Sequence, residues 1–293
     1  MEEDIKDFIG YYKETKRASD NTLQSYKRDL MKMYKFMTMK GIDKASDITV
    51  TNVNAYLMYL EKEGLSSSTI SRNIASMRAF FRYLLKNRKI DYEPVEFVKS
   101  PSIEKKLPVV LSVEEVDKLL GQLGDKTLKE VRDKAMIELM YATGIRVSEI
   151  INLKLTAVHM DMEYIECKDE KKERIIPFGK SAKKALEKYL TEARKEMVKD
   201  ECEYFFVNCK GSKMSRQGFW KIIKLYGEKA GIKGEITPHI IRHSFAAHLI
   251  ANGAELGVVK EMMGHSDIAS TQIYEYMKTA KIRNTYERTH PRS

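Results

Sequence analysis

A chain of 293 residues is long enough for two domains with a core each, and 43% hydrophobic and 32% charged residues are typical of a soluble, helix-rich protein. No apolar run reaches the ~18 residues of a membrane span, the acidic N-terminus excludes a secretory signal, and the cysteines lack disulfide-framework or zinc spacing. These features predict a cytoplasmic protein, and the net charge of +10 favours a polyanionic partner.

The first hundred residues predict a helical domain. Apolar residues recur there at helical spacing, and the segments are separated by polar residues or glycine. The expected helices span residues 3–17, 19–41, 51–64 and 66–87.

The helix expected at 66–87 has an apolar face and a basic face. The apolar face, expected to be buried, consists of Ile70, Ile74, Met77, Phe81, Leu84 and Leu85. The opposite face carries the cations Arg72, Arg82 and Lys86. Small residues, Ser76 among them, lie between these cations and would let the helix approach a phosphate backbone. We therefore expect the three cations to bind DNA, and a solvated basic face is the alternative.

A stretch with three prolines separates the two parts of the chain. Residues 93–110 show neither helical nor strand periodicity and contain the expected linker. We place the domains at residues 1–100 and 108–293, with the linker at residues 101–107.

The second domain opens with strong helix signals. Ser112 and Glu115 form a capping box, and a second helix is expected to end at Gly144. Further helices are expected at residues 146–155, 180–197, 215–231, 237–253, 255–264 and 267–290. On the helix at 215–231, we expect Arg216 and Lys221 to contact DNA.

Short β segments interrupt these helices. Residues 162–167 and 173–178 flank the charged stretch KDEKK, which predicts a β-hairpin with an exposed, lysine-rich turn. Residues 204–207, YFFV, predict a short buried strand. The fold class is therefore mainly α with a small β-sheet.

Histidines gather near the end of the chain. His239 and His243 have the i, i+4 spacing of some metal sites, but Arg242 lies between them and no glutamate does. We therefore expect no metal. A phosphate suits His239 and Arg242 better, because these residues share a helix face and arginine offers two parallel donors.

Three segments carry a resemblance to a known family. ATGIRVSEI (142–150), TPHIIRHSFAAHL (237–249) and GHSDIASTQIYEY (264–276) resemble, in order and spacing, the signature boxes of the tyrosine recombinases, and of their Xer-type members most closely. The resemblance covers most of residues 108–293, and the first part resembles the family's core-binding domain in layout. It implies a SAM-like helical domain and a catalytic domain that form a clamp around double-stranded DNA. It also implies a homo- or hetero-tetramer on DNA, assembled by exchange of the C-terminal tail, and no cofactor.

The resemblance also assigns roles to single residues. Arg146 and Arg242 would bind the scissile phosphate. His239 and His265 would be the two active-site histidines, and Tyr274 would be the nucleophile.

The supporting acid and the lysine complete the expected site. Glu149 would support Arg146 from the following helical turn. The family pattern around its hairpin lysine is approximately GKGxKxRxxP, whereas this chain has CKDEKKERIIP, one residue longer and without those glycines. We expect Lys168 to be the general acid, with Lys171 and Lys172 as alternatives.

The chemistry of a DNA phosphodiester explains this set of residues. Its transition state concentrates negative charge on oxygens, which two arginines and a histidine neutralise without a metal. A cationic environment favours the phenolate of a tyrosine, and a lysine supplies the proton that the leaving 5′-oxygen needs. We therefore expect a site-specific recombinase that acts through a 3′-phosphotyrosine, either in chromosome dimer resolution or as the integrase of a mobile element. The alternative is a non-catalytic, sequence-specific DNA-binding protein on the same fold.

Overall fold

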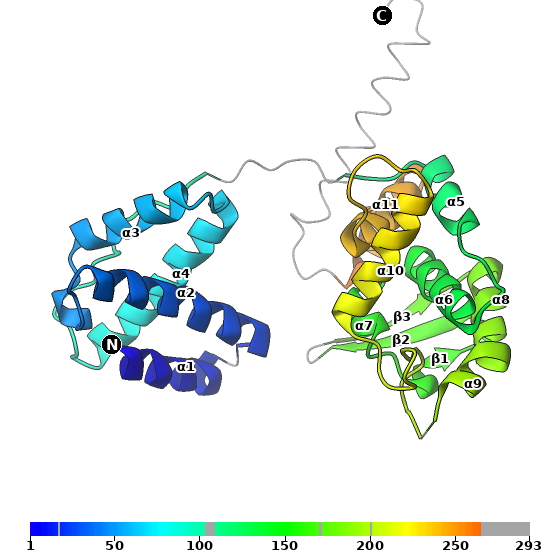
Figure 1. The fold of residues 1–293 in the computed structure, drawn as a ribbon, viewed down its shortest axis with the longest axis horizontal. Helices are drawn as coiled ribbons and strands as arrows, with labels where there is room; N and C mark the ends of the chain where they lie inside the picture. The colour runs from blue at the N-terminus through cyan, green and yellow to red at the C-terminus, as the bar shows by residue number, and fades with distance from the viewer. Residues whose placement is uncertain (17, 103–108, 170–171, 200, 265–293) are drawn as a thin grey trace, which may run out of the picture. The chain divides into compact units, whose positions relative to one another are not determined.

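The chain divides into two compact units, Met1–Lys106 and Leu107–Ser293 (Figure 1). The computed structural model describes residues 1–16, 18–102, 109–169, 172–199 and 201–264, without the side chains of residues 169 and 172. Across these ranges, no helix is both long and apolar enough to cross a membrane.

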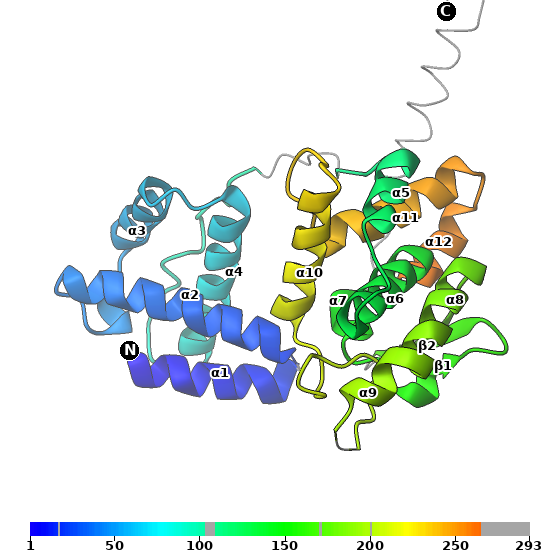
Figure 2. The same ribbon diagram turned by 45° about the vertical axis from the view of Figure 1, so that its right-hand side comes forward.

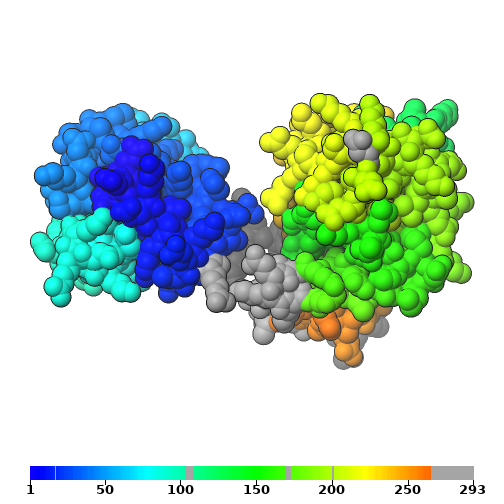
Figure 3. Space-filling view, turned by 90° about the horizontal axis from the view of Figure 1, so that it is seen from below, coloured from blue at the N-terminus to red at the C-terminus, as the bar shows by residue number. Residues whose placement is uncertain are grey.

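The first unit is helical, as predicted. Its long helices are α1 (Glu2–Lys16), α2 (Asp20–Met39), α3 (Val50–Lys62) and α4 (Ser67–Lys86). A short 3-10 helix, Ala45–Asp47, precedes α3. Helix α2 packs against α1 and α4 (Figure 2), and α1, dark blue in Figure 3, lies at the surface of this unit.

Helix α4 buries a broader arc than the sequence prediction allowed. The expected apolar face is buried except for Leu85, which is 39% exposed because it lies at the edge of the stripe. Phe80 is fully buried in its place. Ser76, expected on the basic face, is also fully buried and donates a hydrogen bond to the carbonyl of Asn73. The predictions for Leu85 and Ser76 are therefore wrong.

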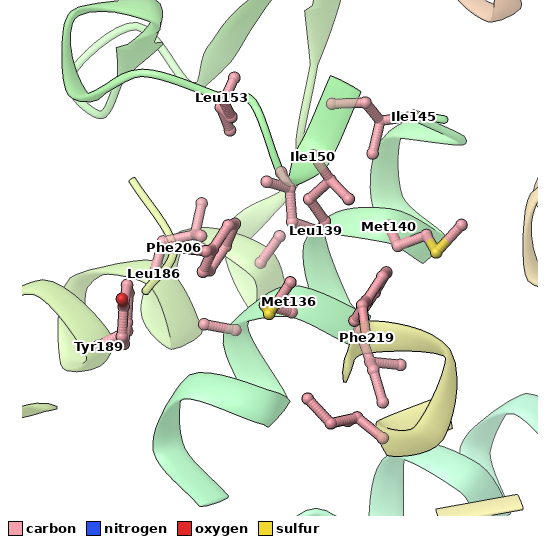
Figure 4. Close-up of a cluster of buried hydrophobic side chains, with 14 of the residues drawn as sticks. Met136, Leu139, Met140, Ile145, Ile150, Leu153, Leu186, Tyr189, Phe206 and Phe219 are labelled. Atoms are coloured by element: carbon pink, nitrogen blue, oxygen red, sulfur yellow. The ribbon is translucent and has the colours of Figure 1, made fainter. Parts of the chain in front are cut away.

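The second unit is built around α6. Its helices are α5 (Val113–Gly121), α6 (Leu128–Thr143), α7 (Val147–Ile150), α8 (Lys180–Lys188), α9 (Lys195–Met197), α10 (Arg216–Lys229), α11 (Pro238–Ala251) and α12 (Leu256–Met263). Helix α6 packs against α8 and α11. Figure 4 shows Met136 and Leu139 of α6 in the same buried cluster as Leu186 of α8 and Phe219 of α10.

A three-stranded antiparallel sheet lies in this unit, in the order β1 (Val158–His159), β2 (Tyr164–Asp169) and β3 (Lys172–Pro177). The hairpin of β2 and β3 was predicted, but both strands lie closer to its turn than the expected residues 162–167 and 173–178. Asp169 pairs with Lys172, so KDEKK is not a five-residue turn. Cys167 lies opposite Arg174.

Three other local predictions need correction. Residues 204–207 form isolated bridges, Lys154 with Tyr204 and Val207 with Lys213, and not a strand. The helix expected at 146–155 is the single turn of α7. A π-helical segment, Tyr189–Arg194, interrupts the helix expected at 180–197.

Gly144 ends α6 and sets the path of the chain into the site. Its φ is +59°, in the left-handed region. A Cβ there would collide with the Phe245 ring of α11, so the close approach of α6 to α11 requires glycine. The chain then turns directly into Arg146, the residue that precedes α7.

Candidate active site

Arg146 is fixed by Glu149, which lies one turn later. The backbone N–H of Arg146 donates to Oε2 of Glu149 over 2.8 Å, and its Nη1 donates to Oε1 over 2.9 Å. Nη2 of Arg146 donates to the carbonyl of Gly264. The guanidinium is held in place, but the side chain remains 34% exposed, which suits a group that receives an external anion.

Arg242 lies in the first half of α11 and is 5% exposed. Thr237 caps the start of this helix, and Pro238 occupies its first turn. The guanidinium of Arg242 donates to the carbonyls of Gly144 and Met263. The two predicted phosphate-binding arginines therefore donate to neighbouring carbonyls at the C-terminal end of α12.

Arg174 is a third arginine of this cluster, and the sequence interpretation gave it no role. Its Nη1 and Nη2 donate to the two carboxylate oxygens of Glu149 over 2.9 and 2.8 Å. Its Nε donates to the carbonyl of Met262 over 2.8 Å. The signal that could have found it is the arginine of the RxxP pattern, which Arg174 and Pro177 match.

Three consecutive carbonyls at the end of α12 therefore accept hydrogen bonds from three arginines. Arg174 binds the carbonyl of residue 262, Arg242 that of residue 263, and Arg146 that of residue 264. The backbone that the three arginines bind is followed in the sequence by His265, in the third signature segment. Such fixed donors need little rearrangement to receive a phosphate.

A cavity of about 580 Å³ opens beside this cluster, and its lining includes Arg146, Glu149, Cys167 and Lys168. Nζ of Lys168 lies 2.9 Å from a carboxylate oxygen of Glu173, and its side chain is 69% exposed. The hydrogen bond and charge of Glu173 raise the pKa of Lys168, so the ammonium form is favoured. Lys168 therefore lines the same cavity as Arg146, and the ammonium form of Lys168 carries the proton that a general acid donates.

Cys167 is a nucleophile type that the sequence interpretation did not consider in this site. The side chain is 3% exposed. Burial, with the charge of Glu149, raises the pKa of the thiol to about 12, although the nearby arginines act in the opposite direction. The thiol therefore stays protonated near neutral pH and is a poor nucleophile.

Of the other predicted catalytic residues, the structure describes some and not others. His239 is exposed at the second position of α11, one turn before Arg242. His265, Tyr274 and Lys171 lie outside the described residues, and Lys172 is described only as part of β3. Within the described ranges, no group of three or more His, Cys, Asp or Glu residues could hold a metal ion.

The three cations predicted to bind DNA from α4 all have partners within the first unit. Arg72 donates two hydrogen bonds of 2.8 Å to the buried carboxylate of Asp29. Arg82 pairs with Glu93 over 3.2 Å. Lys86 lies over the ring of Tyr11. Their contact with DNA stays a prediction, and Arg72 is the most constrained of the three.

Helix α10 carries the two cations predicted to bind DNA from the second unit. Arg216 begins this helix, and both Arg216 and Lys221 are exposed. Lys221 borders a second cavity of about 490 Å³, which Lys129 and Lys210 also line. These side chains gather positive charge beside α10, and contact of Arg216 and Lys221 with DNA stays a prediction.

Comparison with known proteins decides the family. Residues 110–281 match the model of the phage integrase family, and residues 5–88 match that of the phage integrase N-terminal SAM-like domain. The chain belongs to the phage integrase family. Members of this family are tyrosine recombinases, so the SAM-like and catalytic domains predicted from the sequence are confirmed.

Similarity to individual members narrows the type of phage integrase. The chain is 43% identical to the tyrosine recombinase XerD of Oceanobacillus iheyensis, over 100% of both chains. It resembles the crystal structure of XerA recombinase (27% identity, TM-score 0.56, 99% of each chain). It also shares the fold of XerH bound to palindromic difH substrate (22% identity, TM-score 0.77, covering 90% of this chain and 78% of that one). This member is a Xer-type tyrosine recombinase, a DNA strand-exchange enzyme, and nothing in these likenesses favours the non-catalytic alternative.

Proposed function

We propose that the chain cleaves and rejoins double-stranded DNA at a specific site, with Tyr274 as the nucleophile. The phenolic oxygen of Tyr274 attacks the scissile phosphorus, the bond to the 5′-oxygen breaks, and a 3′-phosphotyrosine forms. The 5′-hydroxyl of another strand then attacks this linkage and releases the tyrosine. The number of phosphoester bonds is unchanged, so the exchange needs no ATP.

The observation that carries this proposal is the arrangement of Arg146 and Arg242. Both guanidinium groups bind the carbonyls at the end of α12, directly before the segment with His265 and Tyr274. The described hydrogen bonds of the Arg146 side chain use two of its five N–H donors. Donors therefore remain for the non-bridging oxygens of a phosphate, and His239 and His265 complete this set in our proposal.

Proton transfer to the leaving oxygen is assigned to Lys168. It lines the same cavity as Arg146, and its ammonium form is favoured by Glu173. Release from Glu173 when DNA binds would make the proton available, because the carboxylate no longer stabilises the charged form.

The proposed biological role is that of a Xer-type recombinase acting on DNA in the cytoplasm. Similarity to XerD over the full length of both chains supports this role more than that of a mobile-element integrase. XerH is described as bound to its difH substrate, and lambda integrase as a dimer on a core site. By analogy, two domains would clamp the duplex, and tetramers would assemble through exchange of C-terminal tails.

The test of this function is covalent capture of DNA without metal. The recombination site is first selected from a random-sequence duplex pool by binding to the protein and is then built into a nicked suicide duplex. We expect a protein–DNA adduct joined through a 3′-phosphate, at the same rate in excess EDTA as in Mg²⁺, because cationic side chains replace a metal. Binding without any adduct would support the non-catalytic alternative, and cleavage that requires Mg²⁺ or Zn²⁺ would exclude this mechanism.

The role of Lys168 predicts a specific chemical rescue. Lys168→Ala should slow cleavage of ordinary DNA by about 10²-fold or more, the usual range for a lost general acid. Replacing the 5′-bridging oxygen with sulfur should restore the rate, since a thiolate leaves without a proton. Gel analysis of adduct formation on both duplexes measures the effect.

The neighbouring lysines provide the controls for this rescue. Lys171→Ala and Lys172→Ala should lose little activity and show no rescue by sulfur. Rescue confined to one of those variants would move the assignment to that lysine. A lack of rescue in all three variants would exclude the hairpin lysines from proton transfer.

A further inference from the structure

Arg174 joins three parts of the site although it touches neither proposed phosphate-binding arginine in the described hydrogen bonds. From β3 it reaches both carboxylate oxygens of Glu149 and the carbonyl of Met262. Its side chain is only 8% exposed. It therefore connects the hairpin, the turn at α7 and the end of α12.

Charge is the first reason why this position matters. Glu149 carries one negative charge and accepts hydrogen bonds from two arginines, Arg146 and Arg174. With both present, the three side chains keep a net charge of +1. Without Arg174, Glu149 would pair with Arg146 alone, and the pair would be neutral. Arg174 thus lets Glu149 orient Arg146 without cancelling the charge that a phosphate needs.

Packing against the backbone is the second reason. Gly264 has a φ of +61°, and a Cβ there would lie 2.8 Å from Nη1 of Arg174. The guanidinium therefore lies directly against the last described residue of the chain, whose carbonyl binds Arg146. Movement of Arg174 would change both the carboxylate and the backbone that hold Arg146.

We propose that Arg174 is a positioning residue of the recombination reaction, which holds Glu149 and the end of α12 so that Arg146 stays oriented and Glu149 does not cancel its positive charge. This inference rests on the proposed role of Arg146 in binding phosphate. It gives the hairpin a second part in the reaction, separate from proton transfer by Lys168.

The ionisation of Glu149 supplies a readout that packing alone would not change. Burial by itself would raise the pKa of Glu149, but hydrogen bonds from Arg174 and the backbone of Arg146, with both arginine charges, hold it below its usual range. Among the described residues, the thiol of Cys167 also interacts with this carboxylate, and it stays neutral. Loss of Arg174 removes the largest opposing influence, so the pKa of Glu149 should rise. As the pH is lowered, Glu149 should then become protonated at a higher pH than in the wild type, and activity that depends on the ionised carboxylate should be lost at that higher pH.

The experiment compares Arg174→Met, Arg174→Lys and Glu149→Gln with the double variant that combines Arg174→Met and Glu149→Gln. Arg174→Met should form adduct on the suicide duplex about 10-fold to 10²-fold more slowly, since small misplacements of catalytic groups have effects of that size. DNA affinity should stay close to that of the wild type. Arg174→Lys should recover part of the rate, and the double variant should be no slower than the slower single variant, because both changes affect one interaction.

Two further measurements separate this inference from the proposed function. Carbon-13 NMR titration of the Glu149 carboxyl group, assigned with Glu149→Gln, needs no recombination activity and should show the raised pKa in Arg174→Met. Arg194→Met is the matched control, because Arg194 donates to the backbone carbonyls of Cys202, Tyr204 and Phe205 and should leave the pH profile unchanged. A wild type that forms no adduct contradicts the proposed function. An unchanged Glu149 pKa, or wild-type cleavage by Arg174→Met, overturns the role of Arg174.

Discussion

The Tyr274→Phe variant is expected to form no detectable covalent adduct with the suicide duplex while binding the same duplex with near wild-type affinity. Only one oxygen is lost, but that oxygen is the atom that would attack phosphorus, and phenylalanine offers no substitute. Denaturing gel electrophoresis of the protein with labelled DNA measures the adduct, and a mobility-shift titration measures binding.

Tyr276 provides the matched control, because it lies two residues further along the same segment. Tyr276→Phe should form the adduct at the wild-type rate. If Tyr274→Phe keeps its adduct and Tyr276→Phe loses it, the nucleophile is Tyr276. If both variants keep it, neither tyrosine is the nucleophile.

Arg146→Ala and Arg242→Ala are each expected to slow cleavage by on the order of 10²-fold or more. Both remove fixed, positively charged donors from the place where negative charge develops, and losses of this size follow removal of such a donor. Single-turnover adduct formation at saturating protein isolates the chemical step from DNA binding.

Stability must be measured beside activity, because Arg242 is buried and binds two backbone carbonyls. Arg242→Lys keeps the charge but loses the fork of parallel donors, so it should fold better than Arg242→Ala and still cleave slowly. Thermal unfolding of each variant identifies any loss that comes from folding. Wild-type cleavage rates in folded Arg146→Ala would remove Arg146 from the phosphate site.

Local sequence signals were sufficient for most helices. The capping box of Ser112 and Glu115 starts α5, and Gly144 ends α6, as predicted. Both signals act within a few residues, so the sequence carries them directly. The π-helical segment within 180–197 has no such signal, and the strand expected at 204–207 was misjudged because a buried apolar run fits several structures.

The active site shows a similar limit. Arg146 and Arg242 could be assigned because whole sequence segments resemble the family's signature boxes. The RxxP pattern marks Arg174, but it does not reveal the role of this residue, because its partners Glu149 and Met262 lie 25 and 88 residues away in the sequence. The pairing of Arg72 with Asp29, 43 residues away, was hidden for the same reason. Side-chain partners that the fold brings together decide whether a cation is available, and periodicity does not reveal them.

The arginine contacts at the end of α12 also determine how this region opens. The last carbonyls of any helix lack partners within the helix. Here the carbonyls of Met262 and Met263, and that of the capping residue Gly264, accept hydrogen bonds from side chains of the active site. Helix α12 therefore has a complete C-terminal cap only while the arginine cluster is assembled. For the end of α12 to fray, the arginines must release its carbonyls. Such linked openings form one cooperative unit, so exchange of the α12 amide hydrogens with solvent reports the integrity of the active site before any DNA is bound.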